Sequence, residues 1–215
     1  RRFIRKNSRA VTVVVGCYSQ VAANRIAMID GVDYVIGNHD KLNFLDYLAD
    51  EKPASPVVVR ERISREDFSI GFVGDPDFEQ RANLKIQDGC DFMCSFCVIP
   101  FARGRARSRD WEDLFGEARQ MIDKGVREFI LTGVNLGTYE SKGNDFLALI
   151  DGLAEMPGVE RLRISSIEPT TIPSELFGMM ADPEHSLMPY LHIPMQSCCD
   201  RTLAGMKRKY GMEEM

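Results

Sequence analysis

Three cysteines within eight positions constrain this chain more than any other feature. Cys90, Cys94 and Cys97 have the spacing C-x3-C-x2-C and come directly after a predicted strand at 83–88. In sheets built from β/α units, the loops at the carboxyl ends of the strands form the active site. The whole chain of 215 residues has only six cysteines, too few for a disulfide scaffold. The pattern therefore predicts a metal centre in a reducing compartment.

The spacing favours a [4Fe–4S] cluster. Three thiolates can hold three irons of a cubane, which leaves the fourth iron without a protein ligand. That open iron suits chelation by S-adenosylmethionine (SAM), whose cleavage the cluster then drives, so we expect no catalytic residue beyond the cluster ligands. Three alternatives stay open: a zinc site, which needs a fourth ligand although His185 and His192 are far away in sequence; a ferredoxin-type cluster; and buried unreactive thiols.

The N-terminal part alternates predicted strands and helices. The β-branched run Val11–Val15 is typical of a buried parallel strand, and a helical pattern follows at 18–30. A second strand is expected at 33–36, after which Asn38 can cap a helix over 38–49. This rhythm indicates a small α/β domain.

The rest of the chain predicts a linker and then a parallel sheet. Prolines, glycines and charges dominate residues 50–80, where we expect one or two irregular strands. Strands are expected at 83–88, 128–133, 160–165 and 189–194, and helices at 110–124, 144–155, 172–181 and 199–208. The predicted domains are 1–52, 53–80 and 81–215.

Charge and hydropathy exclude some classes of protein. The formal net charge is −5, so any contact with RNA must come from a local basic patch. No apolar run approaches the roughly 20 residues that span a bilayer, and no signal-like segment follows the basic start Arg1–Arg9. We therefore expect a cytoplasmic protein with no membrane partner.

Short motifs around the triplet resemble the methylthiotransferase family of radical SAM enzymes. They are Gln87-Asp-Gly-Cys90, Cys97-Val-Ile-Pro100, Arg103-Gly104 and Ser108-Arg109. Val15-Gly-Cys17-Tyr-Ser-Gln20 is similar to the last of three cysteine motifs in the family's N-terminal domain. The resemblance implies an α/β fold in which a partial flavodoxin-like domain precedes an incomplete radical SAM (β/α) barrel. We expect the chain to be a piece of a longer protein.

The resemblance also implies cofactors and partners. Cys17 would be one ligand of a second, auxiliary [4Fe–4S] cluster that delivers sulfur, and its two other ligands would lie outside these residues. The reaction would convert C–H to C–S–CH3, with SAM as cosubstrate. The expected partners are a tRNA anticodon stem-loop and an electron donor of the flavodoxin or ferredoxin type.

Three further segments bear on the substrate. Ile130–Tyr139, Met206–Tyr210 and Arg163–Glu168 look most like the branch that modifies threonylcarbamoyladenosine in tRNA. The alternatives are the branch that acts on isopentenyladenosine in tRNA and the branch that acts on an aspartate of a ribosomal protein. A non-enzymatic iron–sulfur or zinc module that binds RNA is the rival from another class.

Polar and small residues at the predicted strand ends are candidates for binding SAM. The resemblance and this position point to Gly133, Asn135, Ser165, Ser166, Glu168 and Gln196. Ordinary turns between strand and helix are the alternative. After Gln196, the family usually has Gly-Ser where this chain has Cys198-Cys199, and we interpret both as loop or core thiols.

Four arginines alternate beside the cluster loop, at Arg103, Arg105, Arg107 and Arg109. If this segment is extended, all four point to one face and form a phosphate-binding stripe for RNA. The alternatives are a solvated or ion-paired loop, or a role for Arg103 in ordering the cluster loop.

Overall fold

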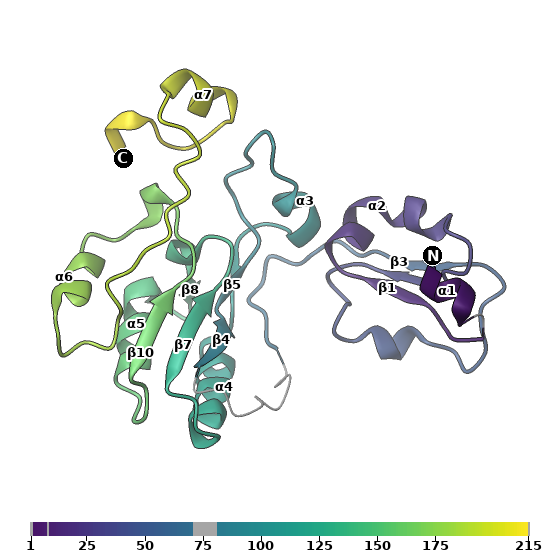
Figure 1. Cartoon of the computed structure of the whole chain (residues 1–215), viewed down its shortest axis with the longest axis horizontal. Coiled ribbons are helices and arrows are strands. Elements are labelled where there is room, and N and C mark those ends of the chain that lie inside the picture. The colour runs from purple at the N-terminus through teal and green to yellow at the C-terminus, as the bar shows by residue number, and fades with distance from the viewer. Residues whose placement is uncertain (1, 8, 71–80, 215) are drawn as a thin grey trace. The chain divides into compact units, whose positions relative to one another are not determined.

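The computed structural model describes residues 2–7, 9–70 and 81–214 (Figure 1). The chain divides into two compact units. The first unit contains the residues up to Ser64 together with Val98–Gly104, and the second contains the other described residues. The end of the predicted linker, residues 71–80, lies outside the described residues.

The first unit is built on a parallel three-stranded sheet in the order β1-β2-β3, with strands Val13–Val15, Tyr34–Ile36 and Val57–Val59. Helix α2 (Cys17–Ala27) follows β1 and packs against the sheet. Ala23, Ile26, Val32 and Val35 form its small core. Because the strands are parallel, the loops that follow them meet at one edge.

The second unit contains a parallel sheet in the order β10-β7-β4, with strands Arg161–Ile164, Glu128–Thr132 and Arg81–Lys85. Figure 1 shows helices α4 (Trp111–Asp123) and α5 (Phe146–Ala154) behind this sheet. Asp110 and Asp145 cap them by accepting hydrogen bonds from the backbone N–H of Asp113 and Ala148. The apolar faces of both helices and of the sheet form the main core.

Shorter elements complete the two units. They are helices α1 (Arg2–Lys6), α3 (Ile99–Arg103), α6 (Leu176–Ala181) and α7 (Asp200–Gly205), strands β5 (Gln87–Asp88), β6 (Arg107–Ser108), β8 (Glu140–Ser141) and β9 (Asn144–Asp145), and 3₁₀ turns at Phe44–Tyr47, Leu136–Thr138, Pro169–Thr171 and Met212–Glu214. The predicted α/β class is confirmed. The three strands of the larger sheet do not close into a barrel within the described residues.

The helix predicted over 38–49 is wrong. Turns occupy most of this segment, and only Phe44–Tyr47 is helical, as a 3₁₀ turn. The side chain of Asn38 donates hydrogen bonds to Cys17 Sγ and to the backbone oxygen of Ala102. It is therefore not used as a helix cap.

The strand predicted at 189–194 is also wrong. One parallel bridge joins Leu187 to Leu162 of β10, and the following residues form no ladder. Pro189 and Pro194 lack the backbone N–H that a ladder needs, which explains why the pairing does not continue beyond the bridge at Leu187. None of the helices in the described ranges is long and apolar enough to cross a membrane.

Candidate active site

The cysteine triplet lies in a loop that follows β5 in the second unit. All three thiols are free; Cys94 is buried, and Cys90 and Cys97 are partly exposed. The backbone N–H of Ser95 donates to the oxygen of Met206 at 3.0 Å, and its hydroxyl donates to the oxygen of Gly205 at 3.0 Å. These bonds fix the middle of the loop to the end of α7.

The pKa of the Cys90 thiol lies above its ordinary value. Burial is the main cause, and the negative charges of Cys94, Glu168 and Cys97 act in the same direction, whereas the hydrogen bond that the backbone N–H of Phe92 donates to Sγ acts in the opposite direction. A metal group that binds thiolates relieves this repulsion, because each ligand is then paired with a cation.

The separation of the sulfurs bears on the kind of metal. A zinc ion with Zn–S bonds of 2.3 Å holds thiolates about 3.8 Å apart. Among the described residues, the three sulfurs of the triplet do not all lie within 4.8 Å of one another. At least one pair is therefore farther apart than in a zinc tetrahedron.

Gln87 joins the cluster loop to the neighbouring strand end. Its buried side-chain oxygen accepts hydrogen bonds from the backbone N–H of Val134 (2.8 Å) and Asn135 (3.0 Å), just after β7. Its Nε2 donates to the backbone oxygens of Asp88 and Gly89. Gly133 packs so closely that an added Cβ would lie 2.9 Å from the Gln87 oxygen. Gln87 therefore positions two loops of the site.

Asn135 is buried between the ends of β7 and β10. Its Oδ1 accepts hydrogen bonds from the backbone N–H of Glu168 (3.2 Å) and the hydroxyl of Thr171 (2.7 Å). Its buried Nδ2 has no hydrogen-bond partner. A buried donor without an acceptor is costly, so this group is suited to bind a ligand oxygen.

Arg208 is a site residue that the sequence patterns did not single out as functional. Its Nη1 donates to Cys94 Sγ at 3.2 Å, and its Nη2 donates to the carboxylate of Glu168. Tyr210 accepts from both Nε and Nη2 of Arg208, and its own hydroxyl donates to the backbone oxygen of Pro194. In the sequence, Arg208 stands out only as part of the Met206–Tyr210 motif, which indicated the substrate branch and not a contact with the cluster loop.

Of the other predicted SAM-binding residues, Ser165 and Ser166 lie at the end of β10, and Gln196 lies in a later loop. Ser165 continues β10, since its N–H donates to the oxygen of Leu131, and Ser166 accepts from the N–H of Leu136. Gln196 is exposed and has a left-handed backbone, with φ of 65°. The structure brings Asn135 and Glu168 into direct contact, whereas a role for Gln196 stays a prediction.

Cys17 is the first residue of α2 in the other unit. Its Sγ accepts a hydrogen bond from Nδ2 of Asn38 at 3.2 Å. Burial acts to raise the pKa of the thiol, but hydrogen bonds from Asn38 and Arg103 and the positive charges of Arg103 and Lys41 lower it overall. A thiolate that protein donors stabilise in this way is a competent metal ligand.

The triplet lies in the part of the chain that matches a known protein family. The model of the Radical SAM superfamily matches residues 84–215, which include all three cysteines. The chain belongs to the radical SAM superfamily. Membership implies that a [4Fe–4S] cluster and SAM are its cofactors.

Curated relatives match nearly the whole chain. A threonylcarbamoyladenosine tRNA methylthiotransferase from Bacillus subtilis is 39% identical over 99% of this chain and 48% of its own length. A relative of the same name from Aquifex aeolicus is 37% identical over 98% of this chain and 52% of its own length. A tRNA-2-methylthio-N(6)-dimethylallyladenosine synthase from Cereibacter sphaeroides is 34% identical over 94% of this chain and 46% of its own length. The radical SAM chain thus spans about half the length of these relatives.

A solved structure supports the fold. The radical S-adenosylmethionine methyltransferase TsrM from Kitasatospora setae, determined with cobalamin and a [4Fe-4S] cluster bound, matches with a TM-score of 0.51 and 16% identity. The match covers 71% of this chain and 32% of that one.

The residues of this radical SAM chain fit the cofactors of its family. Three free thiols from one loop provide the ligands of a cubane with one open iron. The unpartnered Nδ2 of Asn135 is a donor that is available to a ligand oxygen. The donor set and the orphaned donor therefore agree with a SAM-binding cluster site.

The prediction that four alternating arginines form one exposed phosphate-binding stripe is wrong for Arg109 and Arg107. Arg109 is completely buried and forms ion pairs with Asp113 and Glu117, so it cannot contact a phosphate. Arg107 lies on β6 with a side chain 12% exposed, 3.7 Å from the carboxylate of Asp88. Arg105 is 40% exposed beside Asp91, and Arg103 ends α3 in the first unit. Of the three arginines in the second unit, Arg105 has the most exposed side chain.

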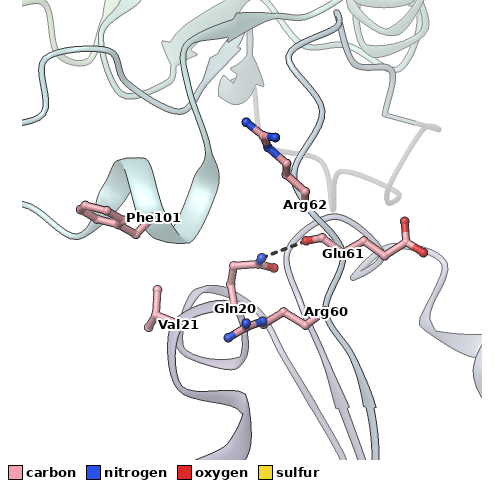
Figure 2. Close-up of a pocket in the computed structure, with 6 residues that line it drawn as sticks. All are labelled: Gln20, Val21, Arg60, Glu61, Arg62 and Phe101. Atoms are coloured by element: carbon pink, nitrogen blue, oxygen red, sulfur yellow. Dashed lines mark hydrogen bonds between the residues drawn. The ribbon is translucent and has the colours of Figure 1, made fainter.

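A pocket of about 440 Å³ opens beside the strand ends of the first unit. Its lining residues are Gln20, Val21, Arg60, Glu61, Arg62 and Phe101 (Figure 2). Figure 2 shows the side chain of Gln20 reaching the backbone oxygen of Glu61, to which Nε2 donates at 3.0 Å. The carboxylate of Glu61 points away from Gln20. Two arginines give the pocket a basic lining.

Proposed function

We propose that this chain is the cluster-binding part of a tRNA methylthiotransferase. The proposed reaction converts C2–H of the adenine in threonylcarbamoyladenosine, beside the anticodon, to C2–S–CH3. The partners would be the anticodon stem-loop and an electron donor of the flavodoxin or ferredoxin type. Such a reaction would take place in the cytoplasm, where tRNA and a reducing environment coincide.

One observation carries this proposal: the similarity to the threonylcarbamoyladenosine tRNA methylthiotransferases continues through both units. The match to the Bacillus subtilis protein covers 99% of this chain, whereas the superfamily model begins at residue 84. The likeness therefore includes Cys17 and its surroundings. A radical SAM domain alone would not account for that.

The residues of the second unit have distinct parts in the proposed function. When bound, the cluster supplies the electron that cleaves SAM. Arg208 holds Cys94 and Glu168 in fixed positions. Gln87 ties the cluster loop to the end of β7, and Asn135 offers its free Nδ2 to the cosubstrate.

Cys17 is proposed as one ligand of the auxiliary cluster that provides sulfur. Its position after β1, with Asn38 and Arg103 stabilising the thiolate, supports this role. The two other ligands would be cysteines outside these residues. Replacing Cys17 with Ser should leave SAM cleavage intact and remove methylthio product, because only sulfur delivery would be lost.

A test distinguishes the substrates. The protein produced from its complete reading frame is incubated anaerobically with SAM, a reductant and tRNA bearing threonylcarbamoyladenosine or isopentenyladenosine, and the nucleosides are analysed by mass spectrometry. We expect methylthio product on threonylcarbamoyladenosine. Product on the isopentenyl substrate alone would overturn the substrate but keep the reaction class. Modification of a ribosomal-protein aspartate, with neither RNA modified, would overturn the tRNA proposal.

The isopentenyladenosine substrate is the second candidate. The relative from Cereibacter sphaeroides, whose name gives dimethylallyladenosine, is 34% identical, only slightly less than the first relatives. This small difference is why both RNAs belong in the assay.

A further inference from the structure

A group of three side chains of types that can bind metals lies in the first unit, outside the cysteine motifs. His39 and Asp40 follow β2, and Glu61 follows β3. These strands pair in parallel, and the backbone N–H of Gly37 donates to the oxygen of Val59, so the two loops leave the same edge side by side. One ligand atom from each of the three side chains lies within 4.8 Å of the others.

The buried member of this group has an unsatisfied oxygen. Asp40 is only 8% exposed. Its Oδ1 accepts a hydrogen bond from the hydroxyl of Tyr47 at 3.0 Å, but its Oδ2 is buried with no hydrogen-bond partner. A buried carboxylate oxygen without a donor or a cation is costly, so such groups are normally paired or coordinate a metal.

No ion pair neutralises either carboxylate in the part of the chain that the structure describes. Within the described residues, neither Asp40 nor Glu61 has a lysine or arginine nitrogen within 4.0 Å. Two carboxylates close together repel one another, and a bound cation would remove that repulsion. The geometry therefore provides two anionic ligands, one imidazole and a reason for a cation to bind.

We propose that His39, Asp40 and Glu61 form a site for a divalent cation. One imidazole and two carboxylates are ligands typical of first-row divalent metals such as Mn²⁺ and Zn²⁺, and water would complete the coordination. The site contains no thiolate, so its chemistry differs from that of the cysteine centres. A cation there joins the loops after β2 and β3, and it holds the loop in which Asn38 contacts Cys17.

The probe is Mn²⁺, because it prefers carboxylate and water ligands over thiolates. The full chain, with its cluster reconstituted anaerobically, is titrated with Mn²⁺, and free Mn²⁺ is measured by electron paramagnetic resonance. We expect one bound Mn²⁺ per chain. His39→Gln and Glu61→Gln should each weaken binding by at least about tenfold, since even supporting residues of metal sites cost that much.

Both variants change exposed side chains, so the core of the first unit is undisturbed. Glu51→Gln is the matched control, because it removes one exposed carboxylate from the same unit without touching the site, and it should bind Mn²⁺ like the parent chain. The absence of stoichiometric binding would overturn the proposal. Binding that His39→Gln and Glu61→Gln leave unchanged would overturn it as well, because the metal would then lie elsewhere.

Discussion

The guanidinium of Arg208 donates a hydrogen bond to Cys94 Sγ at 3.2 Å and at the same time pairs with the carboxylate of Glu168. The two side chains of this ion pair are 3% and 12% exposed. The pair therefore connects a cluster ligand with a residue at the end of β10, in surroundings from which water is largely excluded.

Arg208→Gln should destabilise the second unit, because it leaves Glu168 buried without a cation. Breaking one partner of a buried pair costs about 3–5 kcal/mol of unfolding free energy. Urea denaturation measures the loss. Arg201→Gln, which removes an exposed arginine of α7, is the control and should be nearly neutral. Equal midpoints for the two variants would show that the pair is not structural.

Arg109→Gln should also destabilise the protein by about 3–5 kcal/mol, because it removes a completely buried cation from two partly buried carboxylates, Asp113 and Glu117. Arg119→Gln on the exposed face of α4 is the matched control. Denaturant midpoints of both variants test the prediction. A stable Arg109→Gln protein with impaired RNA binding would instead support the phosphate-binding role that burial argues against.

Arg105→Gln should weaken tRNA binding by the protein from its complete reading frame without a loss of stability, since this side chain is 40% exposed. If Arg105 contacts one phosphate, the slope of log affinity against log salt should fall by about one. Fluorescence anisotropy with an anticodon stem-loop measures the slope. An unchanged slope would place Arg105 outside the RNA contact.

Glu128 should contribute to the pH dependence of stability. Hydrogen bonds from Arg161 and Arg163 hold the pKa of its carboxyl below the ordinary value of 4.5. The charged form is favoured in the folded state, so this stability is present above about pH 4.5 and is lost as the pH falls through the folded pKa. Glu128→Gln should flatten the acid side of the profile, whereas Glu155→Gln, at an exposed position, should not. Parallel profiles for the parent and Glu128→Gln would contradict this.

Local signals predicted the strand before Cys17 and the first long helix of the second unit. The β-branched run before Cys17 forms β1, and the helix predicted at 110–124 is α4. Both follow from strong local patterns: consecutive valines in one case, an Asp110 cap and an apolar stripe in the other. The C-x3-C-x2-C spacing likewise predicted a site at the end of a strand, because ligand spacing is itself local.

The sequence predictions were wrong or incomplete where contacts with residues distant in sequence determine the position of a side chain. Asn38 looks like a helix cap, yet Cys17 and Ala102 compete for its side chain. Arg109 looks like part of a basic stripe, yet Asp113 and Glu117 on α4 draw it into the core. Arg208 was missed because its partner Cys94 lies more than a hundred positions earlier. Tertiary contacts of this kind leave no local pattern.

The central claim is that Cys90, Cys94 and Cys97 hold a cluster that cleaves SAM. The most direct measurement is the formation of 5′-deoxyadenosine from SAM by the anaerobically reconstituted, reduced protein. We predict cleavage by the parent protein and by Cys198→Ala, which removes an exposed loop thiol, and none by Cys94→Ala, because the cluster loses an iron ligand. Cleavage by Cys94→Ala at the parent rate would contradict the account.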